Sequence, residues 1–208
     1  MLASGSTGNA LYIETNEARL LVDAGLSGRQ LEQLLAEHRV GPDQLDAILI
    51  SHEHIDHVKG VGVLARRYQL PVYANRSTWE AIPAQVGEIP EELRQFFATG
   101  KPFRLGDLEI ESFPTSHDAA EPVGFCFYHG TAKLGLVTDL GYMSQKVMDK
   151  VRDADVLILE TNHDVEMLRM GRYPWDVKRR ILSDVGHLSN ESAGDALAEM
   201  FNRGTNIR

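Results

Sequence analysis

Ser51-His52-Glu53-His54-Ile55-Asp56-His57 brings three imidazoles and an aspartate together in one short stretch, and it is the most informative part of the sequence. His52 and His54 are two residues apart, so in an extended backbone both side chains leave on one face and can bind one metal ion. Asp56 and His57 follow where the pattern becomes helical, and we expect them to face a second ion. A histidine-rich surface loop is the alternative, but a run of four such residues favours a metal site.

The H-x-H-x-D-H string resembles the signature of the metallo-β-lactamase fold hydrolases, and this resemblance makes further demands on the chain. The family pattern places an aspartate after an early strand, and here Asp23 follows Leu20-Leu21-Val22. It also places an isolated histidine further on and an aspartate after a later strand, and His117 and Asp139 occupy these places in the family's order. The resemblance runs from about the first strand to the end of the chain. It implies an α/β (α+β) fold class, an αββα sandwich of two mixed sheets flanked by helices.

The apolar runs of the sequence support this arrangement without the family. Four predicted strands end in ionisable or metal-binding residues: Leu20 to Val22, Ala47 to Ile50, Leu134 to Val137 and Val156 to Leu159. Strands of this kind gather their ends at one edge of a sandwich, so we expect the active site at that edge.

Imidazoles and carboxylates make up the whole expected ligand set: His52, His54 and His117 for one ion, and Asp56 and His57 for the other, with Asp139 bridging the two. This assignment follows the family resemblance, and we expect the two ions to be about 3.5–4 Å apart. Asp23 is then expected to orient a ligand imidazole through its N–H group. These ligand types suit Zn or Mn, with Fe also possible, and the absence of cysteine ligands argues against a closed structural zinc site.

The segment Gly186-His187-Leu188-Ser189-Asn190-Glu191 is similar to one in tRNase Z-like phosphodiesterases. There, a histidine that is not a metal ligand helps to protonate the leaving oxygen, and it pairs with a glutamate at the end of the preceding strand. Glu160 stands in the matching position here, so the resemblance makes Asp56, Glu160 and His187 the expected catalytic residues. His187 has two other interpretations. It is either the last metal ligand, which in this family follows a strand near the C-terminus, or a helix-capping residue without a chemical role.

The strings Ser4-Gly5-Ser6-Thr7-Gly8-Asn9 and Glu160-Thr161-Asn162-His163-Asp164 together resemble the YycJ (WalJ)-like branch of this family. That branch is associated with 5′ to 3′ exonuclease activity on double-stranded DNA. A polar turn with exposed N–H groups beside two cations suits a phosphate, so Ser6 and Asn9 are expected to bind substrate, as is His163. An ordinary glycine turn and a hydrogen-bonded structural histidine are the alternatives.

The expected reaction is hydrolysis of a phosphodiester by a metal-activated water, with His187 as the acid and DNA as the substrate. A thioesterase, a lactonase or a small-molecule phosphodiesterase of the same fold would use the same metals with a different pocket, and a non-catalytic scaffold subunit is a further alternative.

The net charge of −9 argues against an extended nucleic-acid surface, because duplex binding depends on Lys and Arg contacts. Basic residues do gather between Arg169 and Arg180, as a DNA-backbone contact or as a solvated helix face.

Length and composition indicate one domain over residues 1–208. A chain of 208 residues with 43% hydrophobic content can bury one substantial core. Cys126 is the only cysteine, so no disulfide forms within the chain, which fits the reducing cytoplasm. No segment approaches the ~18 apolar residues of a membrane span, and no signal peptide is evident. Nothing in the sequence predicts an oligomeric state.

Both ends of the chain look abrupt, so we expect a truncation at the C-terminus and a slight one at the N-terminus. Residues 1–9 resemble a strand already ending in a turn, and Asn206-Ile207-Arg208 resembles the lead into another strand. If His187 is not the last metal ligand, that ligand lies beyond residue 208.

Hydrophobic periodicity predicts helices at residues 30–39, 58–68, 91–97, 145–152, 174–182 and 189–201. Strands are predicted at residues 11–14, 19–22, 47–50, 72–74, 102–105, 109–113, 124–128, 134–138 and 156–159. Strands outnumber helices and several follow one another directly, which agrees with two sheets flanked by helices.

Overall fold

Short apolar strands alternate with amphipathic helices along the chain, and the computed structural model groups them into two units, each with its own sheet. The structure describes residues 1–205. The first unit comprises residues 1–108 and 119–121, and the second comprises residues 109–118 and the chain from residue 122 onward. The predicted lead into a further strand at residues 206–208 lies outside the described residues.

The first unit contains a five-stranded sheet in the order β1-β2-β3-β4-β5. Its strands are β1 (Leu11–Glu14), β2 (Arg19–Val22), β3 (Ala47–Leu49), β4 (Val72–Ala74) and β5 (Arg94–Phe96). β1 and β2 are antiparallel and the remaining pairs are parallel. Because Val22 pairs with Leu49 in parallel register, the residues that follow β2 and β3 emerge at the same edge of the sheet.

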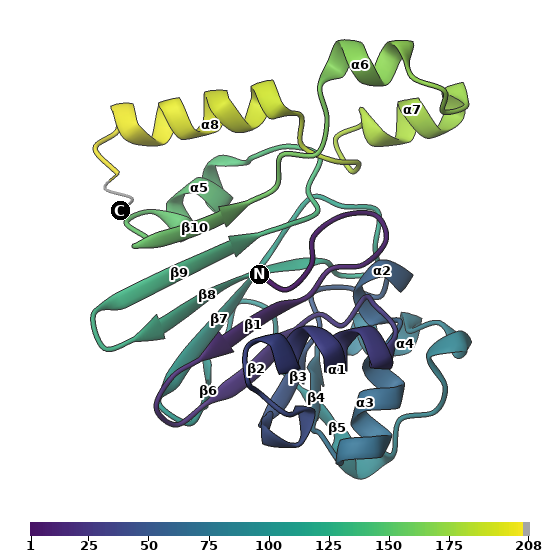
Figure 1. Ribbon diagram of the computed structural model, residues 1–208. Coiled ribbons are helices and arrows are strands. Elements are labelled where there is room, and N and C mark those ends of the chain that lie inside the picture. The colour runs from purple at the N-terminus through teal and green to yellow at the C-terminus, as the bar shows by residue number, and fades with distance from the viewer. Residues whose placement is uncertain (206–208) are drawn as a thin grey trace. The chain divides into compact units, whose positions relative to one another are not determined.

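The helices of the first unit are α1 (Gly28–Glu37), α2 (Ile55–Val58), α3 (Val61–Tyr68) and α4 (Arg76–Ala81), with 3₁₀ turns at Pro42–Gln44, Ala84–Val86 and Glu91–Leu93. α1 begins at a capping box formed by Ser27 and Gln30. Leu35 of α1 and Leu64 of α3 are fully buried in one core with Ile48 of β3. Each such side chain contributes about 1.5–3 kcal/mol of burial free energy, which holds α1 and α3 against the sheet (Figure 1).

Within the second unit, neighbouring strands follow the order β10-β9-β8-β7. These strands are β7 (Leu108–Pro114), β8 (Val123–His129), β9 (Ala132–Val137) and β10 (Val156–Leu159), and β6 (Phe103–Leu105) precedes β7 in the chain. β7, β8 and β9 are antiparallel neighbours, whereas β9 and β10 are parallel. Val137 pairs with Leu159, so the residues after β9 and β10 also share one edge.

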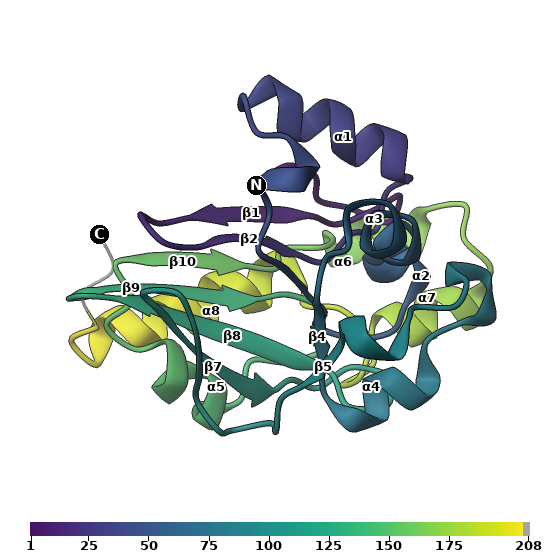
Figure 2. The same cartoon turned by 90° about the horizontal axis from the view of Figure 1, so that it is seen from below.

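The helices of the second unit are α5 (Gln145–Val151), α6 (Val165–Met170), α7 (Trp175–Ile181) and α8 (Asn190–Asn202). Val147 of α5 and Ala193 of α8 share a buried core with Phe113 of β7 and Val137 of β9. α5 and α8 therefore lie against this sheet (Figures 1 and 2). Among residues 1–205, no helix has the length and apolar character needed to cross a membrane.

The predicted strands are confirmed within one or two residues at each end. The helix predicted at residues 91–97 is wrong, and the one predicted at residues 58–68 is confirmed only from residue 61 onward. Residues 91–97 form a single 3₁₀ turn followed by β5, because Arg94–Phe96 pair with β4 instead of continuing a helix. The helix predicted at residues 58–68 is interrupted at Gly60, whose N–H donates to the carbonyl of Ala24 at 2.7 Å. Tertiary hydrogen bonds thus override local helical propensity at both places. The short helices α2, α4 and α6 were not predicted as separate elements.

Candidate metal and catalytic site

Asp23 connects the end of β2 to the histidine-rich segment after β3. Its Oδ1 accepts the backbone N–H of Ser51 at 2.8 Å, and its Oδ2 accepts the Ser51 hydroxyl at 2.8 Å. The same Oδ2 lies 2.8 Å from Nδ1 of His57. Asp23 is 2% exposed and has a left-handed backbone with φ of 59°. The carboxylate is therefore fixed by several hydrogen bonds in an interior where it contacts His57 directly.

These contacts assign the protonated nitrogen of two rings. A carboxylate only accepts, so His57 donates to Asp23 through its Nδ1–H. The Ser51 hydroxyl gives its proton to Asp23 and lies 3.0 Å from Nδ1 of His52, so it accepts the Nδ1–H of His52. Nε2 is then the basic nitrogen of both rings, which is the form that a metal ion requires. The sequence motif alone gave Ser51 no role, whereas in the structure its hydroxyl joins Nδ1 of His52 to Asp23.

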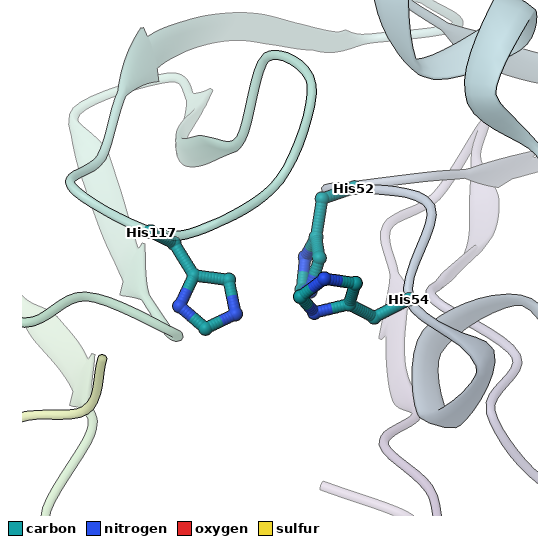
Figure 3. Close-up of side chains that lie close together, drawn as sticks. All are labelled: His52, His54 and His117. Carbon is teal, nitrogen blue, oxygen red and sulfur yellow. The ribbon is translucent and has the colours of Figure 1, made fainter. Parts of the chain in front are cut away.

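The three imidazoles of the segment lie close together. The ring centroids of His52 and His54 are 4.7 Å apart in an edge-to-face arrangement, which Figure 3 shows, and those of His52 and His57 are 4.1 Å apart. Oδ2 of Asp56 is 3.8 Å from Nε2 of His57. Imidazoles this close can direct their ring nitrogens at one cation. Glu53 points elsewhere, since its Oε1 accepts the N–H of Ala120 at 2.8 Å.

The loop before β1 is fastened to the same segment through Asn9. The backbone N–H of Asn9 donates to the carbonyl of Asp56 at 2.8 Å, and its carbonyl accepts the N–H of Gly25 at 2.9 Å. The side-chain Nδ2 of Asn9 is 2.9 Å from Nε2 of His57. Sequence reasoning missed this contact because nothing local relates residue 9 to residue 57. Ser6 is exposed in the turn of the same loop.

Gly25 lies where the loop before β1 meets the segment that carries Asp56 and His57. A Cβ atom on Gly25 would be 1.6 Å from the carbonyl oxygen of Asp56. Glycine is therefore required here by space.

In the second unit, His117, Asp139 and His187 form a second group of potential ligands. Their ligand atoms all lie within 4.8 Å of one another. His117, labelled in Figure 3, follows β7, and its Nδ1–H donates to the carbonyl of Gly186 at 2.9 Å. Asp139 follows β9 with a left-handed φ of 51°. As in the first unit, one imidazole has its Nδ1–H occupied by an acceptor and presents a basic Nε2.

His187 is paired with Glu160, as the sequence comparison of that segment predicted. Nδ1 of His187 is 2.7 Å from Oε1 of Glu160 and 3.5 Å from Oδ1 of Asp139. Burial by itself lowers the pKa of His187, but the hydrogen bonds to Asp139 and Glu160 outweigh it and raise the pKa to about 10. The imidazole is thus held in its charged, proton-donating form. The helix-capping alternative is wrong, because Ser189 is the N-cap of α8 and its side chain accepts the N–H of Ser192.

His163 lies on the segment that follows β10, next to the residues after His187. Its carbonyl accepts the N–H of Asn190 at 2.8 Å, and the N–H of Asn162 donates to the carbonyl of Leu188 at 2.9 Å. Both ring nitrogens of His163 are buried, and neither has a hydrogen-bond partner among residues 1–205. Burial lowers the pKa of His163, so its ring is neutral at pH 7.

Comparison with known proteins gives the family context. A model of the beta-lactamase superfamily domain matches residues 18–204. The chain is 52% identical over 201 residues to exodeoxyribonuclease YycJ of Bacillus anthracis, covering 97% of this chain and 76% of that protein. It is 49% identical over 199 residues to exodeoxyribonuclease WalJ of Streptococcus pneumoniae, covering 95% of this chain and 74% of that protein. The chain thus spans about three quarters of the length of these curated relatives.

Solved structures agree on the fold. Zn²⁺-bound PqqB from Methylobacterium extorquens superimposes with a TM-score of 0.70 at 19% identity, covering 88% of this chain and 69% of that one. The metallo-β-lactamase fold protein YhfI from Bacillus subtilis gives a TM-score of 0.70 at 20% identity, covering 96% of this chain and 77% of that one. The expected fold class, two mixed sheets flanked by helices, is confirmed.

Proposed function

Because the chain belongs to the beta-lactamase superfamily, and within it resembles YycJ and WalJ, we propose that it is a metal-dependent exodeoxyribonuclease that cleaves double-stranded DNA in the 5′ to 3′ direction. The expected class of function, a hydrolytic nuclease of the metallo-β-lactamase fold, is confirmed by the names of these relatives. The polarity, the form of the DNA and the roles of individual residues are the proposal's own content.

The proposed ligands come from both units. His52, His54, Asp56 and His57 of the first unit and His117 and Asp139 of the second would hold two divalent ions, Zn or Mn. The donor chemistry within each unit supports this assignment. The Nδ1–H groups of His52, His57 and His117 are directed to oxygen acceptors, so Nε2 is the basic nitrogen of each ring, the form that binds a cation. Divalent ions bound there would lower the pKa of water toward neutrality and offset the negative charge of a phosphodiester.

The single observation that carries the proposed mechanism is the pairing of His187 with Glu160. Cleavage of a DNA phosphodiester expels an alkoxide oxygen, which is a poor leaving group unless it receives a proton. His187 is charged through its contacts with Glu160 and Asp139, so it can supply that proton. Glu160 keeps the imidazole oriented and stabilises its positive charge. A thioester needs such an acid less, because a thiolate leaves without a proton more readily than an alkoxide, which favours the phosphodiester over the thioester.

The proposal assigns substrate contacts to Ser6, Asn9 and His163. Ser6 is exposed in a turn with Gly5, and the side chain of Asn9 already lies beside His57, so the loop is positioned at the ligand segment. His163 is hydrogen-bonded through its backbone to the segment that carries His187. A cytoplasmic location is part of the proposal, because Cys126 is a free thiol and a reducing compartment preserves it.

Metal content and hydrolysis test the proposal together. Protein purified without added metal is analysed for bound metal, then assayed in Mn and in Zn with bis-p-nitrophenyl phosphate and with duplex DNA labelled at one 5′ end. His54→Ala removes a proposed ligand, and His38→Ala, at an exposed histidine after α1, is the matched control.

We expect bound metal, early release of a labelled mononucleotide from the 5′ end, and loss of both activities in His54→Ala but not in His38→Ala. Metal with turnover of the small diester alone would point to a small-molecule hydrolase. Absence of metal and of all hydrolysis in the wild-type chain would reject the enzyme and favour a scaffold role.

A further inference from the structure

The segment after β10, α6 and the start of the α6–α7 connection enclose a pocket of about 540 Å³ in the second unit. This volume falls within the roughly 300–1,000 Å³ of small-molecule sites. The pocket is lined by His163, by Met167 and Leu168 of α6, and by Arg172 and Tyr173 beyond it. The metal and acid residues assigned above are absent from this lining, so the pocket is a separate feature that needs its own explanation.

The pocket is joined directly to the segment that carries the proposed acid. Asn162 and Asn190 lie on its wall. The N–H of Asn162 donates to the carbonyl of Leu188, the residue after His187, and the N–H of Asn190 donates to the carbonyl of His163. The side chain of Asn162 also donates to Oε1 of Glu160 at 3.4 Å. A molecule in the pocket would therefore contact Asn162, which is hydrogen-bonded both to Glu160 and to the residue that follows His187.

The lining residues are of the kinds that bind a nucleotide. Tyr173 is 59% exposed and Met167 is 75% exposed, and together they offer an apolar surface and an aromatic ring for a base. Arg172 forms no ion pair among residues 1–205, so its guanidinium can take a phosphate. Asp164 also lines the pocket, but one oxygen of its carboxylate is engaged as the N-cap of α6.

The basic residues near this pocket differ in what they can bind. Lys178 is buried, and its Nζ donates to the carbonyls of Arg169 and Gly171, which joins α7 to the end of α6. Arg180 is paired with Asp118 at 2.9 Å. Arg172 and Arg179 are exposed and form no ion pair among the described residues, and of these two only Arg172 lines the pocket.

His163 supplies an independent indication of a ligand. Leaving a buried polar group without a hydrogen bond is unfavourable, and both ring nitrogens of His163 are in this state among residues 1–205. Its ring is neutral, so one nitrogen can donate and the other accept. The edge of a nucleobase carries both donors and acceptors, so it can supply a partner for a ring nitrogen of His163 in either role.

We propose that this pocket binds one unpaired nucleotide of the DNA substrate, with the base against Tyr173 and Met167, its edge toward His163, and its phosphate at Arg172. The inference rests on the proposed nuclease function and adds a substrate subsite to it. An unpaired end held here would keep the adjoining strand near His187. The enzyme should therefore prefer a duplex with a short single-stranded end to a blunt one.

Binding without metal tests the subsite directly. In EDTA, the full chain is titrated into a fluorescent duplex with a three-nucleotide 5′ overhang, into the blunt duplex, and into the overhang duplex in the presence of dAMP. Tyr173→Leu and Arg172→Gln alter the pocket. Met170→Leu and Arg179→Gln change exposed neighbours outside the pocket and are the matched controls. Tyr173→Trp keeps an aromatic ring at the position of Tyr173.

We expect tighter binding of the overhang duplex than of the blunt one by wild type. The Kd for the overhang duplex should rise about tenfold in Tyr173→Leu and Arg172→Gln, the loss typical of removing a stacking or phosphate contact, and remain unchanged in both controls and in Tyr173→Trp. Competition by dAMP should be weaker in the two pocket variants than in wild type. Turnover of bis-p-nitrophenyl phosphate, which is too small to use the pocket, should stay at the wild-type rate in every variant.

Equal affinity of pocket variants and wild type for the overhang duplex would overturn the subsite. Binding of dAMP that depends on Tyr173, without any preference for the overhang, would overturn it as a DNA subsite and make the pocket a free-nucleotide site. If wild type hydrolyses neither DNA nor the small diester, the nuclease proposal fails, while the binding titration still decides the subsite by itself.

Discussion

Nδ1 of His187 lies 2.7 Å from Oε1 of Glu160, and Oε2 of the same carboxylate accepts the backbone N–H groups of Leu140 and Leu188 at 3.0 and 3.2 Å. Glu160 is therefore held by two segments of backbone while it holds the imidazole. His57 makes the same kind of contact, an Nδ1–H given to the carboxylate of Asp23, so this contact suits a metal ligand as well as a proton donor. The pKa of His187, which its carboxylate partners raise to about 10, favours the proton donor.

Replacing His187 by asparagine should have an effect that depends on the leaving group. Cleavage of DNA should fall by about 10²–10⁴-fold, because an alkoxide must be protonated as it leaves. Hydrolysis of bis-p-nitrophenyl phosphate should fall by about tenfold at most, since p-nitrophenolate is stable without a proton. Rates on both substrates, measured at equal metal content, check this prediction. His38→Asn should change neither rate, and an equal loss on both substrates would instead assign His187 to the metal.

Replacing Asp23 by asparagine should weaken metal binding by about 10–100-fold. The amide nitrogen of asparagine cannot accept a hydrogen bond, so the contacts with Ser51 and His57 cannot all be kept. Metal release is followed during a chelator titration. Asp153→Asn is the matched control, because Asp153 also has a left-handed backbone, with φ of 58°, but is exposed. Release of metal at the same chelator concentration in both variants would show that Asp23 has no influence on the ligands.

Two glycine-to-alanine changes should act in opposite directions on stability. At Gly25 the added methyl group would meet the carbonyl of Asp56, so we expect a loss of about 2 kcal/mol or more in the free energy of unfolding. At Gly194, inside α8, a Cβ meets nothing within 4 Å, so alanine should add about 0.4–1 kcal/mol. Urea unfolding in EDTA measures both without a contribution from metal. A stable Gly25→Ala protein would mean that the loop before β1 can move away from Asp56.

Cys126 should be unreactive until the protein unfolds. Its side chain is fully buried in β8, and burial raises the pKa of the thiol, so the reactive thiolate is scarce at pH 8. Reaction with Ellman's reagent should be at least about tenfold slower for the native protein than for the protein in concentrated urea. Rapid labelling under native conditions would indicate that β8 opens frequently.

The sequence was sufficient to predict the strands that position the site, although not β5, and the residues that follow them. Asp23, Asp139 and Glu160 each come after a short apolar run, and the parallel pairs β2–β3 and β9–β10 bring such strand ends to a shared edge, as expected. The pairing of Glu160 with His187 was also predictable, but only through the resemblance to related phosphodiesterases. No local pattern connects a strand end to a residue far along the chain.

Other parts of the site could not be predicted because they depend on tertiary contacts. The contact of Asn9 with His57 and the role of Ser51 between His52 and Asp23 arise from the way β2, β3 and the first loop meet. The pocket beside α6 is formed by a short helix that has too few residues for a clear hydrophobic period. Buried Lys178 shows the same limit: composition suggested a basic surface, whereas its ammonium group binds backbone carbonyls.

The left-handed backbone at Asp23 and Asp139, with φ of 59° and 51°, bears on how relatives of this protein should be judged. Apart from glycine, aspartate and asparagine adopt this conformation most readily. In a descendant that had lost its metals, the chain conformation alone would thus still favour Asp, Asn or Gly at both positions. His52 and His117 have no such backbone restriction. In a relative, loss of these histidines is therefore good evidence that the enzyme has lost its activity. Retention of the two aspartates is weaker evidence that the enzyme is active.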